Sequence, residues 1–192
     1  MITIEARQLI ALSTITSIEN WRSALQCVCL RKKSRYIEAI ATDSFSLARF
    51  INEEEQGEEE EEILIPKEVI KNLKAKDGLC EVSINDGIGK IDVGSCSFSF
   101  LPCESPYPTP ESIERLFKKN EGAPAGEGTF DPFRMSAMCN VFAKGFGMSK
   151  KAAKALKIDL NNQDKNGYLA PALFSAFVEE TEFNGLVMPM RD

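Results

Sequence analysis

Apolar and polar positions alternate along much of this 192-residue chain, and short stretches with helical spacing interrupt the alternation. Period-two runs or strand-forming residue types predict strands at residues 2–6, 24–30, 36–42 and 46–51. After the first of these strands, one broad helical face is formed by Leu9, Ile10, Leu12 and Ile15. The first fifty residues therefore predict one strand, one helix and then three strands.

The same order of elements begins again at residue 62. A strand over residues 62–66 ends at Pro66, which precedes a helix over 67–75 with Val69, Ile70 and Leu73 on its inner side. Three further strands are predicted at residues 80–85, 90–94 and 96–101. Glycines at 87 and 89 are better explained by a tight turn than by a phosphate-binding loop.

A third unit closes the chain. It follows a linker over residues 111–127, rich in proline and glycine, with one helical patch at 111–118. The unit contains a strand at 128–130 and a helix that Asp131 caps and Pro132 begins. Strands are then predicted at 155–160, 168–177 and 183–190. The pattern indicates an α+β protein built from three strand-helix-three-strand units.

The net charge of −6 comes from one segment. Eight glutamates lie within residues 53–62, and the rest of the chain would carry a formal charge of +2 without them. A block of like charges repels itself, so we expect a solvated, solubilising loop. Mimicry of DNA by this acidic block, or autoinhibition, is the alternative.

Candidate chemistry for catalysis is sparse. The chain contains no histidine, which excludes Ser-His and Cys-His nucleophile pairs and mixed Cys-His zinc sites. Phosphate-loop motifs are also absent from the sequence. The six cysteines form no C-x-x-C pair, and we expect them to be buried thiols. We therefore predict no enzyme activity, no cofactor and no bound metal.

Cellular location follows from two negative features of the sequence. The N-terminus lacks a basic region followed by an apolar core, and no apolar run approaches the length of a bilayer span. We expect a cytoplasmic protein without a membrane partner.

Four motifs and the order of the units resemble the bacterial sliding clamp, the beta subunit of DNA polymerase III. The motifs are ATDSFSLA at residues 41–48, SPYPTPESI at 105–113, FDP before a helix and MPMR near the C-terminus. In that family each domain is two units back to back. The resemblance implies a DNA clamp fold, with antiparallel sheets outside and helices on the one face that lines a hole for duplex DNA.

The resemblance covers only part of a clamp, which has three domains and six units. Residues 1–110 resemble the complete middle domain, 111–127 a linker, and 128–192 the second half of the last domain. The missing units supply the family's ring-closing contacts. Encirclement of DNA would then require a homo-oligomer in which further copies supply those units.

The family docks polymerases and the clamp loader through short peptides that enter an apolar pocket between the middle and last domains. By resemblance, the pocket residues here are Leu25, Thr42, Ser44, Phe45, Ser46, Leu47, Pro108, Ser112, Ile113, Asp131, Arg134, Met188, Pro189, Met190 and Arg191. Methionine is flexible and polarisable, which suits a pocket for varied apolar ligands. From spacing alone, Val187 and Met188 are core residues and Met190 a frayed end.

Basic residues on the predicted helices are candidates for salt-sensitive contact with the DNA backbone: Arg7, Lys67, Lys71, Lys74, Lys76 and Lys144. The alternative is that these side chains are simply solvated. A further basic run follows at residues 149–157. Residues 162–169 resemble a calcium loop, but a hairpin turn at Asn166 and Gly167 explains them better.

Two functions remain open beside a third hypothesis, an unrelated enzyme, for which the sequence offers no nucleophile-base pair. The first is a noncatalytic sliding-clamp-like protein of DNA replication that binds polymerase or clamp-loader peptides and encircles DNA as an oligomer. The second is a peptide-binding decoy or regulator of replication that does not encircle DNA. Solution mass separates the two.

Overall fold

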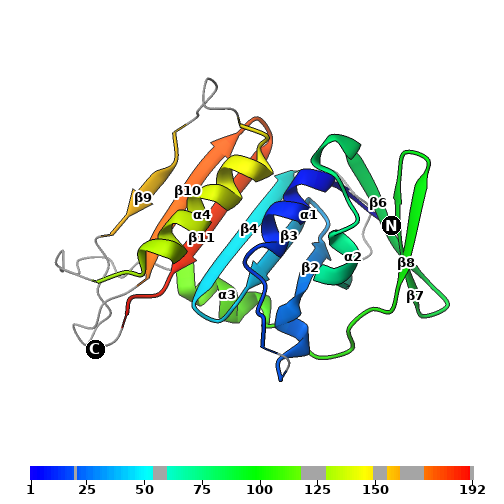
Figure 1. The fold of residues 1–192 in the computed structure, drawn as a ribbon, viewed down its shortest axis with the longest axis horizontal. Coiled ribbons are helices and arrows are strands. Elements are labelled where there is room, and N and C mark those ends of the chain that lie inside the picture. The colour runs from blue at the N-terminus through cyan, green and yellow to red at the C-terminus, as the bar shows by residue number, and fades with distance from the viewer. Residues whose placement is uncertain (20, 54–59, 118–128, 149–154, 161–170, 191–192) are drawn as a thin grey trace.

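The structure is a computed structural model that describes residues 1–19, 21–53, 60–117, 129–148, 155–160 and 171–190 (Figure 1). Its strands are β1 (Ile2–Glu5), β2 (Cys27–Lys32), β3 (Tyr36–Thr42), β4 (Ser46–Glu53), β5 (Glu61–Pro66), β6 (Leu79–Asn85), β7 (Ile88–Val93), β8 (Cys96–Phe100), β9 (Lys157–Asp159), β10 (Ala172–Val178) and β11 (Thr181–Val187). Its helices are α1 (Ala6–Ser13), α2 (Lys67–Ile70), α3 (Pro110–Phe117) and α4 (Pro132–Gly145), with 3-10 turns η1 (Ser23–Gln26) and η2 (Ala75–Asp77).

The strands form two antiparallel sheets in which the first two units exchange their first strands. The smaller sheet has the order β1-β6-β7-β8, and the larger has the order β5-β2-β3-β4-β11-β10-β9. β1 of the first unit pairs with β6 of the second, with Ile2 opposite Val82. β5 of the second unit pairs with β2 of the first, with Leu64 opposite Cys29. Neither sheet is therefore complete without a strand from the other unit.

The third unit joins the larger sheet directly. β11 lies antiparallel to β4 over the full length of the pairing, from Thr181 opposite Asn52 to Val187 opposite Ser46. β10 and then β9 continue the sheet outward. The predicted segments 1–110 and 128–192 thus share one sheet, while the domain boundaries themselves stay a prediction.

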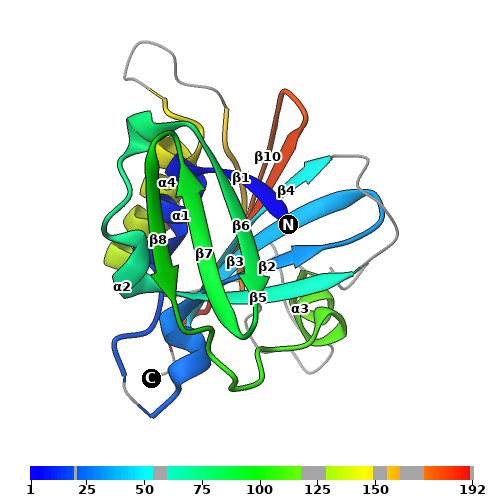
Figure 2. The same ribbon diagram turned by 90° about the vertical axis from the view of Figure 1, so that its right-hand side faces the viewer.

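The helices divide between the two faces of the larger sheet. α1 and α4 pack against each other on one face, with α2 on the same side (Figure 1). α3 lies on the opposite face (Figure 2), where Glu114 and Phe117 contact Arg49 of β4. This arrangement gives the α+β fold predicted from the sequence, with three helices gathered in one layer.

The main core lies between this helix layer and the sheets. Leu9 and Leu12 of α1 and Met138 and Val141 of α4 are fully buried, as helical spacing requires. Phe50 of β4 contacts two other rings, at centroid distances of 5.2 Å for Phe183 and 5.5 Å for Phe146. Such edge-on and tilted aromatic contacts add to the apolar burial that fixes α4 on the sheet.

Most predicted elements are confirmed, but several boundaries are corrected. The strand predicted at residues 183–190 begins at Thr181 and ends at Val187. Residues 24–26 belong to η1 rather than to a strand, so β2 begins only at Cys27. The helix predicted over residues 67–75 ends at Ile70. Leu73 is nevertheless buried, because a turn and η2 continue the inward spacing. A bond from the backbone N–H of Lys74 to the Asp77 carboxylate, 2.7 Å long, stabilises that turn.

The strand predicted at residues 128–130 is wrong where the structure describes it. Thr129 and Phe130 are in no strand, although the Thr129 carbonyl accepts a bond from Met190 N–H at 2.9 Å. In the first two units the initial strand joins the sheet of a paired unit. The third unit has no such partner within the described residues, so its first segment has no ladder to join.

The acidic block was predicted to be a solvated loop, and residues 54–59 lie outside the described part of the chain. Its last three glutamates make ion pairs. Glu60 contacts Lys33 at 2.5 Å, Glu61 contacts the N-terminal amine at 3.1 Å, and Glu62 contacts Arg31 at 2.7 Å. The end of the block therefore neutralises cations that flank the edge of the larger sheet.

The prediction of buried thiols is confirmed for Cys27, Cys29 and Cys80 and wrong for Cys96 and Cys139, which are exposed. Cys96 begins the terminal strand β8, and Cys139 is on the solvent side of α4. Burial raises the pKa of Cys80 to about 11, as expected for an inert thiol. Within the described residues, the helices are too short or too polar to traverse a lipid bilayer.

Gly145 at the end of α4 provides a test of this packing. A Cβ atom added there would lie 2.0 Å from the ring of Phe50, which Phe146 and Phe183 hold in place. We expect Gly145→Ala to lower the free energy of unfolding by about 1–3 kcal/mol through overpacking, although alanine favours helices.

Urea unfolding followed by circular dichroism measures this change. Asn140→Ala at an exposed position of α4 is the matched control, and it should leave the stability unchanged or raise it slightly. A Gly145→Ala variant as stable as the parent would contradict the close packing of α4 against β4.

Candidate peptide-docking site

The face of the larger sheet opposite α1 and α4 carries a second apolar cluster. It comprises Ala24, Leu25, Cys27, Cys29, Ile40, Leu47, Leu64, Tyr107, Ile113, Leu173 and Leu186, with Cys103, Phe117 and Met188 packed against it. Leu47, Leu186 and Leu173 lie opposite one another on β4, β11 and β10 and form a row across the three strands. This cluster, the outer cluster, forms the floor of the candidate site.

The linker helix α3 covers part of the outer cluster and is fixed by a buried ion network. Glu38 lies between Arg31 and Arg49, at 3.5 and 3.2 Å, and all three side chains are less than 10% exposed. Arg49 also pairs with Glu114 of α3, and its guanidinium lies 4.4 Å from the ring centroid of Phe117. The network therefore connects β2, β3 and β4 to the linker, and its charges are compensated within the fold.

The turn between β3 and β4 forms one wall of the site. The Asp43 carboxylate accepts bonds from the backbone N–H groups of Phe45 (2.9 Å) and Ser46 (2.6 Å). Ser44 has a φ of 79°, a left-handed conformation that costs a non-glycine residue energy. Its hydroxyl accepts a bond of 2.6 Å from Arg22. The turn holds the Phe45 ring outward, with 55% of it exposed.

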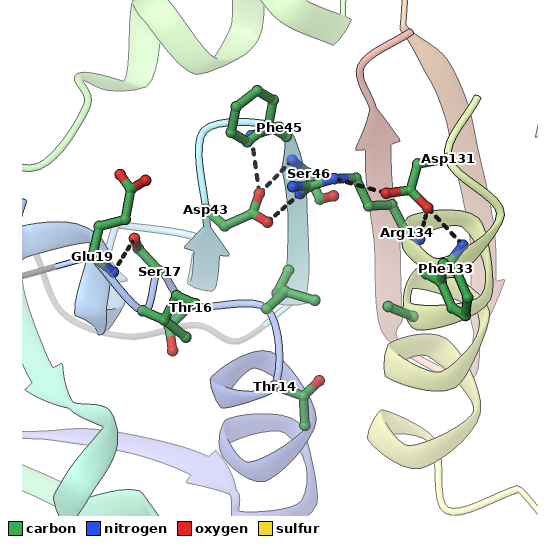
Figure 3. Close-up of a pocket in the computed structure, with 13 residues that line it drawn as sticks. Thr14, Thr16, Ser17, Glu19, Asp43, Phe45, Ser46, Asp131, Phe133 and Arg134 are labelled. Carbon is green, nitrogen blue, oxygen red and sulfur yellow. Dashed lines mark hydrogen bonds and ion pairs between the residues drawn. The ribbon is translucent and has the colours of Figure 1, made fainter. Parts of the chain in front are cut away.

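Arg134 joins this turn to the third unit. Asp131 caps α4 as predicted, because its carboxylate accepts bonds from the N–H groups of Phe133 (2.8 Å) and Arg134 (3.4 Å). The Arg134 guanidinium pairs with Asp43 and with Asp131, and it lies 4.5 Å from the ring centroid of Phe45. Figure 3 shows these side chains meeting between the turn and the start of α4. One guanidinium thus bridges two carboxylates from separate units.

Two cavities adjoin Arg134. The first, about 540 Å³, is lined by Ser44, Phe45, Asp131, Arg134, Met188, Pro189 and Met190. The second, about 430 Å³, extends from Phe45 and Arg134 to residues 14–19 after α1 (Figure 3). Met188 N–H bonds to the Phe45 carbonyl at 2.8 Å, which fixes the C-terminal segment against the turn. The first cavity therefore has an apolar lining supplied by both the turn and the C-terminal segment.

A third cavity, about 500 Å³, lies beside residues 101–109, which join β8 to α3 and form with α3 the structural linker to the third unit. Its lining includes Leu25, Pro108 and Ser112 from the predicted site, together with Trp21 and Tyr107. The Pro108 carbonyl accepts a bond of 2.5 Å from Arg31, which holds the linker against the sheet. The Tyr107 ring is buried and lies 5.7 Å from the Arg31 guanidinium.

The structure places most of the predicted site residues in the first cavity, in the third cavity or in the outer cluster. Ser44, Phe45, Asp131, Arg134, Met188, Pro189 and Met190 meet at the first cavity, and Leu25, Pro108 and Ser112 meet at the third. Leu47 and Ile113 are buried in the outer cluster, and Thr42 and Ser46 are buried in the turn. Arg191 lies outside the described residues.

The sequence prediction missed many of the lining residues, among them residues 14–19 of the second cavity and Asp43, Trp21 and Phe133. Asp43 lies in the ATDSFSLA motif, but its pairing with Arg134 joins positions 91 residues apart, which local spacing cannot reveal. Trp21 and Phe133 are 67% and 84% exposed and line the cavities. The signal that the sequence offered for Trp21 and Phe133 was a large aromatic residue in a predicted loop or at the start of a predicted helix.

The basic candidates for DNA contact lie in or beside the helix layer, but several already have partners. Lys67 donates to the Ser17 carbonyl at 2.8 Å, Lys71 pairs with Glu68 at 2.6 Å, and Arg7 lies 3.7 Å from Glu5. The remaining candidates, Lys74, Lys76 and Lys144, are exposed. Contact with DNA stays a prediction.

Within the described residues, His, Cys, Asp and Glu side chains form no cluster of three that could hold a metal ion. The possible calcium loop and its alternative hairpin turn at residues 162–169 fall outside the described part of the chain. The first and second cavities share Arg134, whose guanidinium is paired with Asp43 and Asp131.

The exchanged first strands, the shared sheet and the helix layer define the fold of the DNA polymerase sliding clamps. The beta subunit from DNA polymerase of Streptococcus pyogenes matches all of this chain with a TM-score of 0.67 at 13% identity. The sliding clamp of Bacillus subtilis matches it at 0.66 with 15% identity, and that of Pseudomonas aeruginosa bound to griselimycin at 0.62 with 15%.

The chain spans 66%, 64% and 65% of these three clamps, just under two thirds of their length. Family models and curated protein sequences gave no match to it. At such low identity the likeness establishes the fold, a shortened clamp-like architecture, and confirms the fold class predicted from the sequence.

The Arg134–Asp43 pair tests how the third unit is held. Both side chains are less than a third exposed, and we expect Arg134→Ala to lower the free energy of unfolding by about 1–2 kcal/mol. In a double-mutant cycle with Asp43→Ala, the coupling should be about 0.5–1 kcal/mol, measured by urea unfolding.

The exposed Lys90–Asp92 pair on β7, 2.8 Å apart, is the control for that cycle. Its coupling should be close to zero, because solvent and salt screen an exposed pair. Equal coupling in the two pairs would show that Arg134 contributes no more than an ordinary surface charge.

Proposed function

We propose that this chain is a noncatalytic sliding-clamp-like protein of DNA replication that docks the clamp-interaction peptides of a polymerase or clamp loader. The observation that carries the proposal is the first cavity, on a sliding-clamp fold. It lies where the C-terminal segment of the third unit meets the β3–β4 turn of the first, and Phe45 and Met190 beside it are more than half exposed.

The chemistry of this cavity favours an apolar peptide anchor. Methionine side chains repack around differently shaped ligands, and Met188 and Met190 both line the cavity. Arg134 is already paired with Asp43 and Asp131, so its charge is largely compensated before any ligand arrives. Affinity should therefore come mainly from apolar burial and depend only weakly on salt.

Peptide titration tests the pocket directly. With a peptide carrying the clamp-interaction motif of a bacterial DNA polymerase, Phe45→Ala and Met190→Ala should each weaken binding about tenfold, through loss of apolar contact. Fluorescence anisotropy of the labelled peptide measures the affinity.

Ile88→Ala is the matched control, since Ile88 is 50% exposed but lies on the β6–β7 hairpin of the smaller sheet. Its affinity should equal that of the parent. If the parent protein showed no detectable binding, or if all three variants bound alike, the docking site would be wrong.

Self-association would supply the units needed to encircle DNA, and β8 is the candidate edge. β8 is the last strand of the smaller sheet and carries no charged residue, whereas the other terminal strands β1, β5 and β9 each carry at least one. Charges on edge strands oppose pairing with other chains. β8 therefore lacks the protection that the other edges have.

The backbone of β8 is suitably oriented for such pairing. Gly94 and Ser95 form a two-residue turn, so Val93 and Cys96 close the β7–β8 hairpin as a hydrogen-bonded pair. Alternation along the strand then directs the N–H and C=O groups of Ser97 and Ser99 away from β7. An edge strand of a second copy could therefore form backbone hydrogen bonds with Ser97 and Ser99.

An assembly of this kind would bring the helix layers of several copies toward DNA. The exposed side chains of Lys74, Lys76 and Lys144 would then contribute nonspecific, salt-sensitive contacts with the phosphate backbone. The alternative function, a peptide-binding decoy or regulator that does not encircle DNA, is favoured by β11 already occupying the edge of β4.

Solution mass distinguishes these two functions. The parent protein should form dimers or larger species as its concentration rises in analytical ultracentrifugation, and Ser97→Lys should shift it toward monomer by placing a charge on the β8 edge. Ser175→Lys, at an exposed position of β10, should assemble like the parent.

A monomer at every concentration would exclude the self-assembled clamp and leave the peptide-binding regulator. Because peptide titration is independent of assembly, the two parts of the proposal can fail separately.

A further inference from the structure

A pair of thiols beside the third cavity is unlike the other cysteines of the chain. Cys27 begins β2 and is buried, and Cys103 lies in the linker and is half-buried. The two side chains are hydrogen-bonded to each other, and Cys103 packs against the outer cluster that contains Cys27. They lie 76 positions apart in the sequence, so only the fold brings them together.

Two serines complete the group around Cys103. The Ser23 and Ser105 hydroxyls are 2.7 Å apart, and both bond to the Cys103 sulfur, as does the backbone N–H of Ser105. The Ser23 carbonyl lies 3.5 Å from the Cys27 sulfur and is the alternative acceptor for its single thiol proton. The linker end is anchored by Cys103 N–H, which bonds to the Leu64 carbonyl at 3.5 Å.

These contacts give the two thiols different acidities. Partial burial would raise the pKa of Cys103, but the bonds from Ser105, Ser23 and Cys27 outweigh it and hold that pKa below the usual thiol value. Burial, reinforced by the nearby Cys103, raises the pKa of Cys27 to about 12. A partly exposed thiol with a lowered pKa is more reactive than a buried one, and a second thiol in contact with it is placed to resolve the product.

We propose that Cys103 and Cys27 form a peroxide-reactive dithiol, in which Cys103 is oxidised first and Cys27 then closes a disulfide between the linker and the start of β2. This site is independent of the proposed clamp function. It rests on the contact between the two thiols and on the ring of donors around Cys103.

The reaction balances with a hydroperoxide as the oxidant. The Cys103 thiolate attacks one peroxide oxygen, the O–O bond breaks, and Cys103 sulfenic acid and water are formed once a proton is supplied. The Cys27 sulfur then attacks the Cys103 sulfur, the S–O bond breaks, and the Cys27 proton leaves with the hydroxyl as a second water. In total, two thiols and one hydrogen peroxide give one disulfide and two waters.

The disulfide would bind the linker to the floor of the third cavity. Ser23 and Ser105 line that cavity with Leu25, Pro108 and Ser112. A covalent bond there would also close a loop that includes most of β2 to β8, which reduces the entropy of the unfolded chain. A higher melting temperature after oxidation, by several degrees, is therefore expected.

The experiment treats the full-length chain with one equivalent of hydrogen peroxide, alkylates the remaining thiols and identifies the peptides by mass spectrometry. We expect a Cys27–Cys103 disulfide peptide that dithiothreitol reduces, with the exposed thiols Cys96 and Cys139 still mostly alkylated. A protein in which Cys96 or Cys139 is oxidised as fast as Cys103, or in which no Cys27–Cys103 peptide forms, would overturn the proposal.

Two variants separate the roles of the thiols. Cys27→Ala should leave Cys103 as a sulfenic acid that dimedone traps, whereas Cys103→Ser should slow peroxide consumption at least tenfold. Cys96→Ser is the control and should oxidise like the parent. If Cys27→Ala does not fold, as circular dichroism would reveal, the disulfide peptide of the parent protein still decides the proposal.

Discussion

The pairing of β11 with β4 is the constraint on which the rest of this structure depends. It places the third unit in the same sheet as the first, over seven residue pairs that run from the top of β4 to the β3–β4 turn. Three contacts of the candidate site depend on the register between β4 and β11. Leu47 meets Leu186, the C-terminal segment reaches Phe45, and α4 arrives beside α1 with Arg134 close to Asp43.

The two faces of the larger sheet are packed by different interactions. The helix face is mostly apolar, with aromatic rings from β4, β11 and α4 in mutual contact, and its buried Gln8 is hydrogen-bonded to Asn52 of β4. The other face combines leucines with a buried ion network, and removal of Glu38 would leave Arg31 and Arg49 without their shared anion. That network fixes the linker by directional bonds, so the walls of the third cavity are held in place by more than apolar contact.

Local signals in the sequence predicted most of the elements. Alternation located β3 exactly, and Asp131 followed by Pro132 located the start of α4, because capping depends on neighbours in the chain. Spacing failed at α2, where Ile70 and Leu73 face inward although the helix has already ended. Residue spacing also could not predict the contact between Arg134 and Asp43, because contacts between positions so far apart depend on how distant strands align. The resemblance to a known family nevertheless placed Arg134 in the candidate site.

The exchange of first strands between the first two units also governs how the chain can fold. β1 finds its partner in β6, so Ile2 pairs with Val82 some eighty residues later, while β5 must return to β2. During synthesis, the N-terminal strand therefore has no ladder to join until β6 has left the ribosome. Such long-range pairing slows folding and leaves β1 exposed in the interval. The first strand of this chain therefore pairs only after β2, β3 and β4, which follow it in the sequence, are able to pair with one another.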